Sequence, residues 1–158
     1  MQKISTCLWF DHQAEEAVNF YTSIFNNSKV LETAYYNEEG RGEPGKIMTI
    51  VFEIEGQRFM ALNGGPEFNF THAISFMVDC KTQEEVDYYW DRLLEGGEEE
   101  QCGWLRDKFG VSWQIIPSII GELLQDQDPE RSKRVMKALM SMIKPDIELM
   151  QRAYNGTD

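Results

Sequence analysis

Apolar and polar residues alternate along positions 1–66 with the periods of one helix and four strands. Residues 4–10 form a short, largely apolar run, which is typical of a strand. Asp11 can cap a helix in which apolar residues recur every three or four positions: Ala14, Ala17, Val18, Tyr21, Ile24 and Phe25. Further strands are predicted at residues 29–37, 47–54 and 57–62. This order is a βαβββ module.

The same order of elements recurs in residues 67–117. The pattern predicts strands at 72–80, 99–105 and 111–116, with a helix opened by the capping box Thr82–Glu85. A shift of 68 (79 − 11) lays Asp11 on Asp79 without a gap, and a shift of 54 (110 − 56) lays Gly56 on Gly110. The repeated order and the two shifts together indicate a tandem duplication.

Residues 118–158 form a third, helical part. Short helices are predicted at residues 119–124, after Asp128-Pro129 and after Pro145-Asp146. One helical face is rich in methionine: Met136, Met140, Met142 and Met150. This face either packs onto the sheet or forms a partner surface or pocket lid. The sequence therefore predicts one α+β domain, 1–158, with modules at 1–66 and 67–117 and a helical C-terminal extension at 118–158.

Composition and charge narrow the function classes. Apolar residues make up 42% of the chain, which is typical of a globular protein, and no apolar run reaches the roughly 18 residues of a membrane span. The net charge of −12 argues against partners such as nucleic acid and anionic membranes. The first residues lack a signal-peptide pattern, and three widely spaced cysteines match neither a disulfide framework nor a zinc site. We therefore expect a cytoplasmic protein.

Two segments of the second module have a specific sequence: Cys102-Gly103-Trp104-Leu105, and Asp107 to Pro117 with the spacing DxFGxSWQ. Other segments accompany them: Trp9-Phe10-Asp11, residues 14–21, 56–66, 74–76, 84–90 and 144–153. Together these segments cover nearly the whole chain, and in them the chain resembles the PhnB-like branch of the vicinal oxygen chelate superfamily. The resemblance implies the fold of glyoxalase, bleomycin-resistance and extradiol dioxygenase proteins, with paired modules that form a curved mixed sheet around a cleft, commonly in homodimers.

Proteins of this branch often carry the label demethylubiquinone methyltransferase. The sequence has no glycine-rich turn between a strand and a helix with a later acidic residue, such as a nucleotide-like cofactor needs. The label is therefore a poor guide to the chemistry of this chain, and we expect no cofactor.

The resemblance also implies where a metal would bind. Metal-dependent relatives place one ligand on the first strand and one on the last strand of each module, which here gives His72 and Gln114. The repeat shifts carry these positions back to Ile4 (72 − 68) and Met60 (114 − 54). Four such side chains do not supply three suitable ligands, so His72 and Gln114 are the only plausible ones and a complete metal site is not expected. A divalent metal stays an alternative if a partner chain lends a ligand.

The remaining candidates fit a cleft that binds an unknown small molecule. His72 is either an acid–base residue or a histidine that hydrogen-bonds to backbone. Gln114 can orient a ligand amide or carbonyl. Apolar candidates line a pocket or fill the core: Trp9, Met60, Trp104 and Trp113. The sequence predicts a metal-free binding protein; the alternatives are a metal-assisted or His72-based lyase, isomerase or dioxygenase, and a protein-interaction module.

Overall fold

The structure, a computed structural model, describes residues 2–157. These residues form two compact units, of which the first ends at Phe70 and the second begins at Thr71. The boundary lies slightly beyond the predicted end of the first module at Pro66. Among residues 2–157, no helix has both the length and the apolar character needed to span a bilayer.

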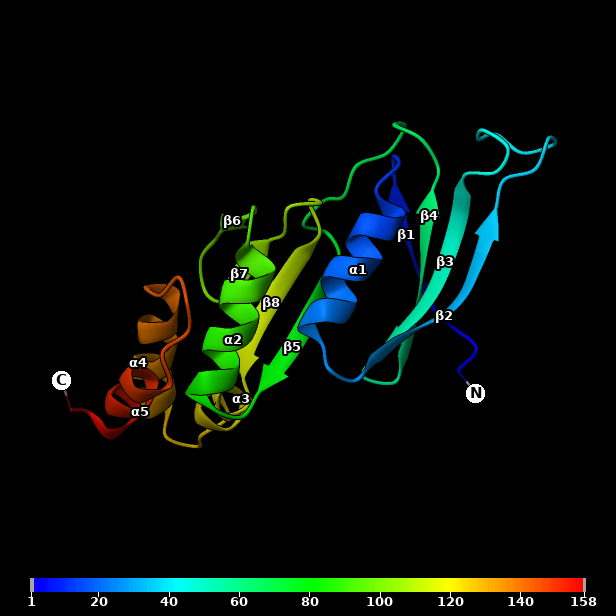
Figure 1. Cartoon of the computed structure of the whole chain (residues 1–158). Coiled ribbons are helices and arrows are strands. Elements are labelled where there is room, and N and C mark those ends of the chain that lie inside the picture. Colours follow the sequence, from blue (N-terminus) through cyan, green and yellow to red (C-terminus); the bar gives the residue numbers. More distant parts are fainter. Residues whose placement is uncertain (1, 158) are drawn as a thin grey trace. The chain divides into compact units, whose positions relative to one another are not determined.

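The first unit is a four-stranded mixed sheet with one helix on one face. Its elements are β1 (Thr6–Phe10), α1 (Ala14–Ile24), β2 (Ser28–Tyr35), β3 (Ile47–Ile54) and β4 (Gln57–Asn63). The strand order is β1-β4-β3-β2, in which β1 is parallel to β4 and the other pairs are antiparallel. Figure 1 shows α1 lying along the sheet. The core between them is aromatic, with Tyr21 stacked on Phe52 and Phe52 stacked on Phe59.

The second unit repeats this topology. Its elements are β5 (Ser75–Cys80), α2 (Gln83–Leu94), β6 (Glu98–Glu99), β7 (Trp104–Arg106) and β8 (Ser112–Pro117). The strand order β5-β8-β7-β6, with β5 parallel to β8, is that of the first unit. The single strand expected at 99–105 is wrong, because Cys102 and Gly103 take left-handed φ angles of 59° and 85° and separate β6 from β7. The α+β fold with tandem βαβββ modules is confirmed.

The register of the repeat differs from the expected one. Thr6 pairs with Phe59 in the first sheet, and Phe76 pairs with Trp113 in the second. The shift of 54 relates Phe59 to Trp113, so the first strands are related by a shift of 70 (76 − 6) rather than 68. The turn from the strand to the helix is one residue shorter in the second module, since Phe10 precedes the N-cap Gln13 by three positions and Cys80 precedes Thr82 by two. Amphipathic helices match at several shifts and conceal such a change.

The two module helices begin in different ways. The Thr82 side chain accepts a hydrogen bond from the Glu85 amide at 3.1 Å, as the capping box predicts. The predicted cap at Asp11 is wrong, because the N-cap is Gln13 and its side chain makes no capping bond. The Oδ1 atom of Asn63, at the end of β4, instead accepts a hydrogen bond from the Ala14 amide at 2.8 Å. A residue 49 positions away thus caps α1.

The C-terminal extension belongs to the second unit and has its own small core. Its helices are α3 (Ile119–Leu124), α4 (Pro129–Met140) and α5 (Ile147–Asn155). They bury a common cluster: Leu123, Val135, Met142 and Met150. Two of the four methionines of the predicted face therefore pack inside. Met136 and Met140 are 44% and 59% exposed. The packing interpretation placed this face on the sheet, whereas the two buried methionines belong to a cluster of the extension's own residues.

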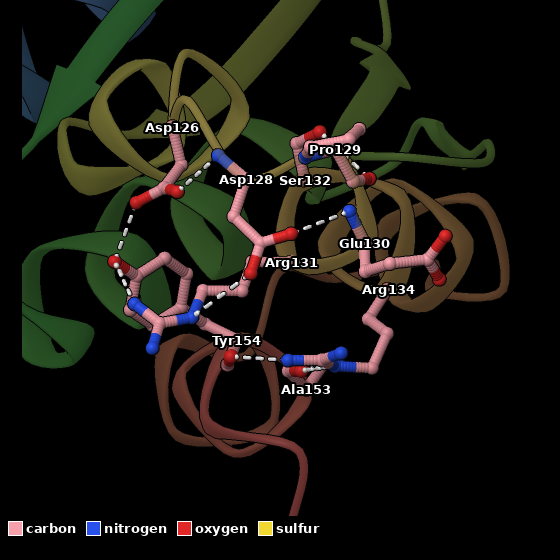
Figure 2. Close-up of polar contacts among 9 residues, drawn as sticks. All are labelled: Asp126, Asp128, Pro129, Glu130, Arg131, Ser132, Arg134, Ala153 and Tyr154. Atoms are coloured by element: carbon pink, nitrogen blue, oxygen red, sulfur yellow. Dashed lines mark hydrogen bonds and ion pairs between the residues drawn. The ribbon is translucent and has the colours of Figure 1, made fainter.

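Polar contacts tie α4 to α5 (Figure 2). The Arg134 guanidinium donates to the carbonyl oxygens of Ala153 at 2.8 Å and Tyr154 at 2.9 Å, at the C-terminus of α5. The Tyr154 hydroxyl donates to Asp126 at 2.6 Å and holds the pKa of that carboxyl below its ordinary value. The two bonds from Arg134 satisfy carbonyl groups at the end of α5, which a helix end leaves without partners. The extension is thus a packed structure rather than a tail.

The extension is also hydrogen-bonded to the turn between β6 and β7 and to the start of α2. The amides of Cys102 and Gly103 donate to the carbonyl oxygens of Met142 at 2.8 Å and Ile143 at 2.9 Å. The Gln83 side chain, at the start of α2, donates to the Pro145 carbonyl at 3.0 Å and accepts from the Ile147 amide at 2.9 Å. The turn between β6 and β7 therefore depends on the segment between α4 and α5.

Candidate functional site

The second sheet has one face under α2 and one face turned away from it, here called the open face. Leu105, Trp113 and Ile115 are buried on the α2 side. Side chains alternate along a strand, so their neighbours lie on the open face. There Trp104 of β7 pairs with Gln114 of β8, and Gln114 pairs with Met77 of β5. The predicted site residues Trp104 and Gln114 are thus cross-strand neighbours.

Glu100 extends this row beyond β7. Glu98 pairs with Arg106 and Glu99 with Leu105, and the Glu100 amide donates to the Trp104 carbonyl at 2.9 Å. By alternation Glu100 lies on the same face as Trp104. Its role could not be predicted from the sequence, because nothing in a run of three glutamates distinguishes the third one; only the strand register does.

The Gln114 amide is held in one orientation. Its Nε2 atom donates to the Ser75 hydroxyl at 2.9 Å, and the side chain is half-buried. The amide oxygen is then directed away from that bond and can accept from a ligand. The expected orienting role of Gln114 stays a prediction, and Ser75 is the residue that would support it.

Ser112 lies on the open face one position further along the sheet. It is 1% exposed, and its hydroxyl oxygen has no hydrogen-bond partner among residues 2–157. A buried hydroxyl without a partner costs about 1–3 kcal/mol of desolvation. Ser112→Ala is therefore expected to leave the free energy of unfolding unchanged or raise it by up to about 1 kcal/mol, measured by urea denaturation. A loss of more than about 1 kcal/mol would contradict this, because it would mean that the hydroxyl makes a stabilising bond.

His72 does not lie where the sequence pattern placed it. The expected strand at 72–80 begins only at Ser75, and His72 is part of the preceding turn. The Thr71 hydroxyl accepts a hydrogen bond from the Ala73 amide at 3.2 Å and stabilises this turn. The Nε2 atom of His72 lies 2.5 Å from Oε2 of Glu100. The histidine therefore contacts a carboxylate side chain. The sequence had predicted either an acid–base role or a hydrogen bond to backbone, and neither prediction named this carboxylate.

Trp113 lies on the opposite face, and its environment favours a core role over the expected ligand contact. Its indole Nε1 donates to Oδ2 of Asp107 at 2.9 Å. Oδ1 of Asp107 accepts from the amides of Phe109 at 2.9 Å and Val111 at 3.0 Å. The carboxylate is 3% exposed. The DxFGxSWQ segment is thus an architectural motif, in which one buried carboxylate fixes both a turn and a tryptophan.

The two other predicted ligand-binding residues lie in the first unit. The Trp9 indole donates to the Gly65 carbonyl at 2.9 Å and meets the Phe68 ring edge-on at 4.9 Å between centroids. Trp9 therefore supports the loop after β4. Met60 pairs with Cys7 on β1 and with Val51 on β3, on the sheet face away from α1. Both side chains are half-buried.

The first unit also has a cavity of about 780 Å³ at one end of its sheet. Its walls are the loop between β2 and β3, the residues that follow β4, and the start of α1. Tyr36 closes one side and donates from its hydroxyl to the Asn63 carbonyl at 2.5 Å. None of the site residues predicted from the sequence lines this cavity.

The donor atoms at the expected metal positions do not fit a hard divalent cation. The β1 residue opposite Met60 is Cys7, and the β5 residue opposite Gln114 is Met77. The position carried back to Ile4 is therefore wrong: His72 lies before β5 rather than on it, and the strand residues related by the shift of 70 are Met77 and Cys7 (77 − 70). A thiol, two thioethers and an amide are poor ligands for Mg²⁺ or Mn²⁺. Within residues 2–157, no three His, Cys, Asp or Glu side chains are grouped as a metal site requires.

Cys7 and Cys80 offer no activated nucleophile. All three thiols are free. Burial, with smaller contributions from Glu85 and Asp79, raises the pKa of Cys80 to about 12, and burial also raises the pKa of Cys7. A thiol with a raised pKa stays protonated near neutral pH and reacts slowly. The candidate site on the open face therefore consists of the Trp104–Gln114 row and the His72–Glu100 contact.

Comparisons with known proteins identify relatives of the two modules. The family model described as 3-demethylubiquinone-9 3-methyltransferase matches residues 2–116. A PhnB protein from Bacillus cereus is 39% identical, with a TM-score of 0.67 over 73% of this chain and 99% of its own. None of the curated proteins matches the chain. The extension, including the expected resemblance at 144–153, lies outside the family match.

More distant structures share the fold alone. A protein from Pseudomonas aeruginosa is 18% identical, with a TM-score of 0.62 over 74% of this chain and 98% of its own. FosX from Listeria monocytogenes, a fosfomycin resistance protein complexed with Mn(II) and a sulfate ion, is 17% identical, with a TM-score of 0.52 over 74% of this chain and 91% of its own. The family match and the Bacillus relative indicate the same family, and the repeated modules are consistent with it. The fold is that of vicinal oxygen chelate proteins such as FosX, and the chain belongs to the PhnB-like 3-demethylubiquinone-9 3-methyltransferase family.

Proposed function

We propose that this protein binds a small organic molecule on the open face of its second sheet, without a metal ion or cofactor. The observation that supports the proposal is the cross-strand row of Trp104 and Gln114, with the Gln114 amide fixed by Ser75. An aromatic ring beside a fixed amide can stack on a planar ligand and hydrogen-bond to it. The thioether and amide side chains opposite each other on β5 and β8 support a binding role rather than metal chemistry.

The proposal concerns binding rather than methyl transfer, despite the name of the family. Methyl transfer from a nucleotide-like donor would need a glycine-rich turn between a strand and a helix, with a later acidic residue. In each unit the first strand is followed by a short turn without a glycine: residues 11–13 before α1 and 81–82 before α2. The family name is therefore not evidence that this chain transfers methyl groups.

Substitutions at Trp104 and Gln114 test the proposal. A panel of aromatic carboxamides and phenols is screened against the protein by thermal shift, and the dissociation constant of the best binder is measured by isothermal titration calorimetry. Trp104→Ala is expected to weaken binding by about tenfold or more, because the lost aromatic contact contributes about 1–3 kcal/mol. Gln114→Leu, which keeps the size and removes the amide, is expected to weaken binding by a similar factor.

The control is Tyr88→Ala, which removes an exposed aromatic ring from α2, away from the open face. This variant is expected to bind the same compound with unchanged affinity. The absence of any binder in the panel, or equal dissociation constants for the wild type and the Trp104 and Gln114 variants, would count against the proposal.

We also propose that the protein acts as a homodimer in the cytoplasm. Three free thiols support a reducing compartment. β2 is an edge strand of the first sheet and exposes large apolar side chains, Val30, Leu31 and Tyr35. Such exposed apolar groups support a protein partner. Light scattering coupled to gel filtration measures the mass: a value twice the 18.4 kDa of the chain supports the dimer, and 18.4 kDa contradicts it.

A further inference from the structure

The contact between His72 and Glu100 joins residues from opposite edges of the second sheet. His72 precedes β5, the strand at one edge, whereas Glu100 follows β6, the strand at the other edge. The His72 side chain is 52% exposed and the Glu100 side chain 25%. An exposed ion pair contributes little to stability. This pair is different, because one of its members is largely buried and comes from the row that contains Trp104.

The hydrogen bond fixes the tautomer of the imidazole. An ionised carboxylate only accepts hydrogen bonds, so the 2.5 Å contact requires a proton on Nε2 of His72. In the neutral ring the other nitrogen, Nδ1, then carries the lone pair. Nδ1 makes no hydrogen bond or ion pair with residues 2–157. The basic nitrogen of His72 is thus available to a ligand.

The second carboxylate oxygen of Glu100 has no partner of its own. Its Oε1 atom is buried and makes no hydrogen bond in the described part of the chain. A buried charged oxygen without a donor is costly, so the bond from His72 to the other oxygen is the one that supports this carboxylate.

We propose that His72 is a general base and that Glu100 is the residue that positions it. The ligand is a small molecule with an acidic O–H or N–H group. The bond between that proton and the ligand breaks, a bond from the proton to Nδ1 forms, and the electron pair stays on the ligand. The resulting imidazolium is paired with Glu100. The nature of the ligand rests on the binding proposed above, whereas the geometry of the pair does not.

Nuclear magnetic resonance of the ligand-free protein tests the pair. The chain has only two histidines, His12 and His72, so the imidazole signals are simple to assign. With Nε2–H bonded to Glu100, His72 is expected to show an Nε2 proton that exchanges slowly enough to be observed in water. Glu100→Leu should abolish this signal. Glu98→Gln, which removes a neighbouring charge that pairs with Arg106, should leave it unchanged.

Carbethoxylation tests whether Nε2 is engaged by Glu100. Diethyl pyrocarbonate modifies neutral imidazoles, and the modification of each histidine is followed by mass spectrometry of its peptide. The ratio of the His72 rate to the His12 rate is expected to rise several-fold in Glu100→Leu, because the loss of the carboxylate frees Nε2 of His72 for modification, and to stay at the wild-type value in Glu98→Gln. A wild-type His72 without a protected Nε2 proton, or a rate ratio that Glu100→Leu does not change, would overturn the inference. Both readouts are independent of the ligand panel, so a failure of the proposed binding function can be told apart from a failure of this pair.

Discussion

Asp107→Ala is expected to lower the free energy of unfolding of the second unit by about 3 to 4 kcal/mol, because three donors lose their acceptor. The amides of Phe109 and Val111 and the indole of Trp113 all donate to this carboxylate. Asp107 is 3% exposed, so water does not replace the lost bonds freely. Urea denaturation followed by circular dichroism measures the change.

Asp91→Ala is the matched control. Asp91 is on α2 of the same unit, its side chain is 71% exposed, and its nearest cation, Lys144, is 3.9 Å away. Its removal is expected to change the free energy of unfolding by less than about 0.5 kcal/mol. If Asp107→Ala destabilised the protein no more than Asp91→Ala, the architectural role of the DxFGxSWQ segment would be wrong.

Gly103→Ala is expected to destabilise the second unit by about 2 to 4 kcal/mol, since two costs add. The φ angle of Gly103 is 85°, which an alanine adopts only with strain. A Cβ atom there would also lie 2.7 Å from the Ile115 carbonyl oxygen and 3.1 Å from Cγ of Pro145. The backbone oxygen cannot move without breaking the bond from the Ile115 amide to Gly103, which is 2.7 Å long. Thermal and urea denaturation measure the loss.

Gly121→Ala controls for the substitution itself. Gly121 lies in α3, and a Cβ atom there would have no heavy atom within 4 Å. Alanine is favoured over glycine in a helix by about 1 kcal/mol, so this variant is expected to be as stable as the wild type or more stable. Equal effects of the two substitutions would show that the close contacts at Gly103 do not determine its identity.

The fold could be predicted because its signals are local and repeated. Hydrophobic periodicity indicated α1, α2 and most of the strands, and the side chains at Thr82, Asp128 and Asp146 cap helices as the pattern predicts. The interruption between β6 and β7 could not be predicted. It depends on a left-handed φ at Cys102, a non-glycine residue, and on hydrogen bonds to Met142 and Ile143, which lie far along the chain.

The candidate site was predicted only in part, because it depends on register. Gln114 and Trp104 were selected from the family resemblance, and the strand pairing places them side by side. Glu100 was missed, since its position opposite Trp104 follows only from the pairing of β6 with β7. A ligand position was carried to Ile4, outside the sheet, because His72 was assigned to the first strand of its module although it precedes β5; the repeat shift was also two residues too small.

The cap that Asn63 provides to α1 has a consequence for the order in which the two modules assemble. Thr82 caps α2 from within its own turn, so the start of α2 can form before any distant part of the chain is in place. The cap of α1 requires β4 to lie beside β1 first, since Asn63 pairs with Phe10 and is 49 residues from Ala14. Contacts that span many residues form late, because closing a long loop costs chain entropy. Two modules of one architecture thus differ in when their helices gain a cap: α2 is capped as soon as its own first turn forms, whereas α1 is capped only once β4 has paired with β1.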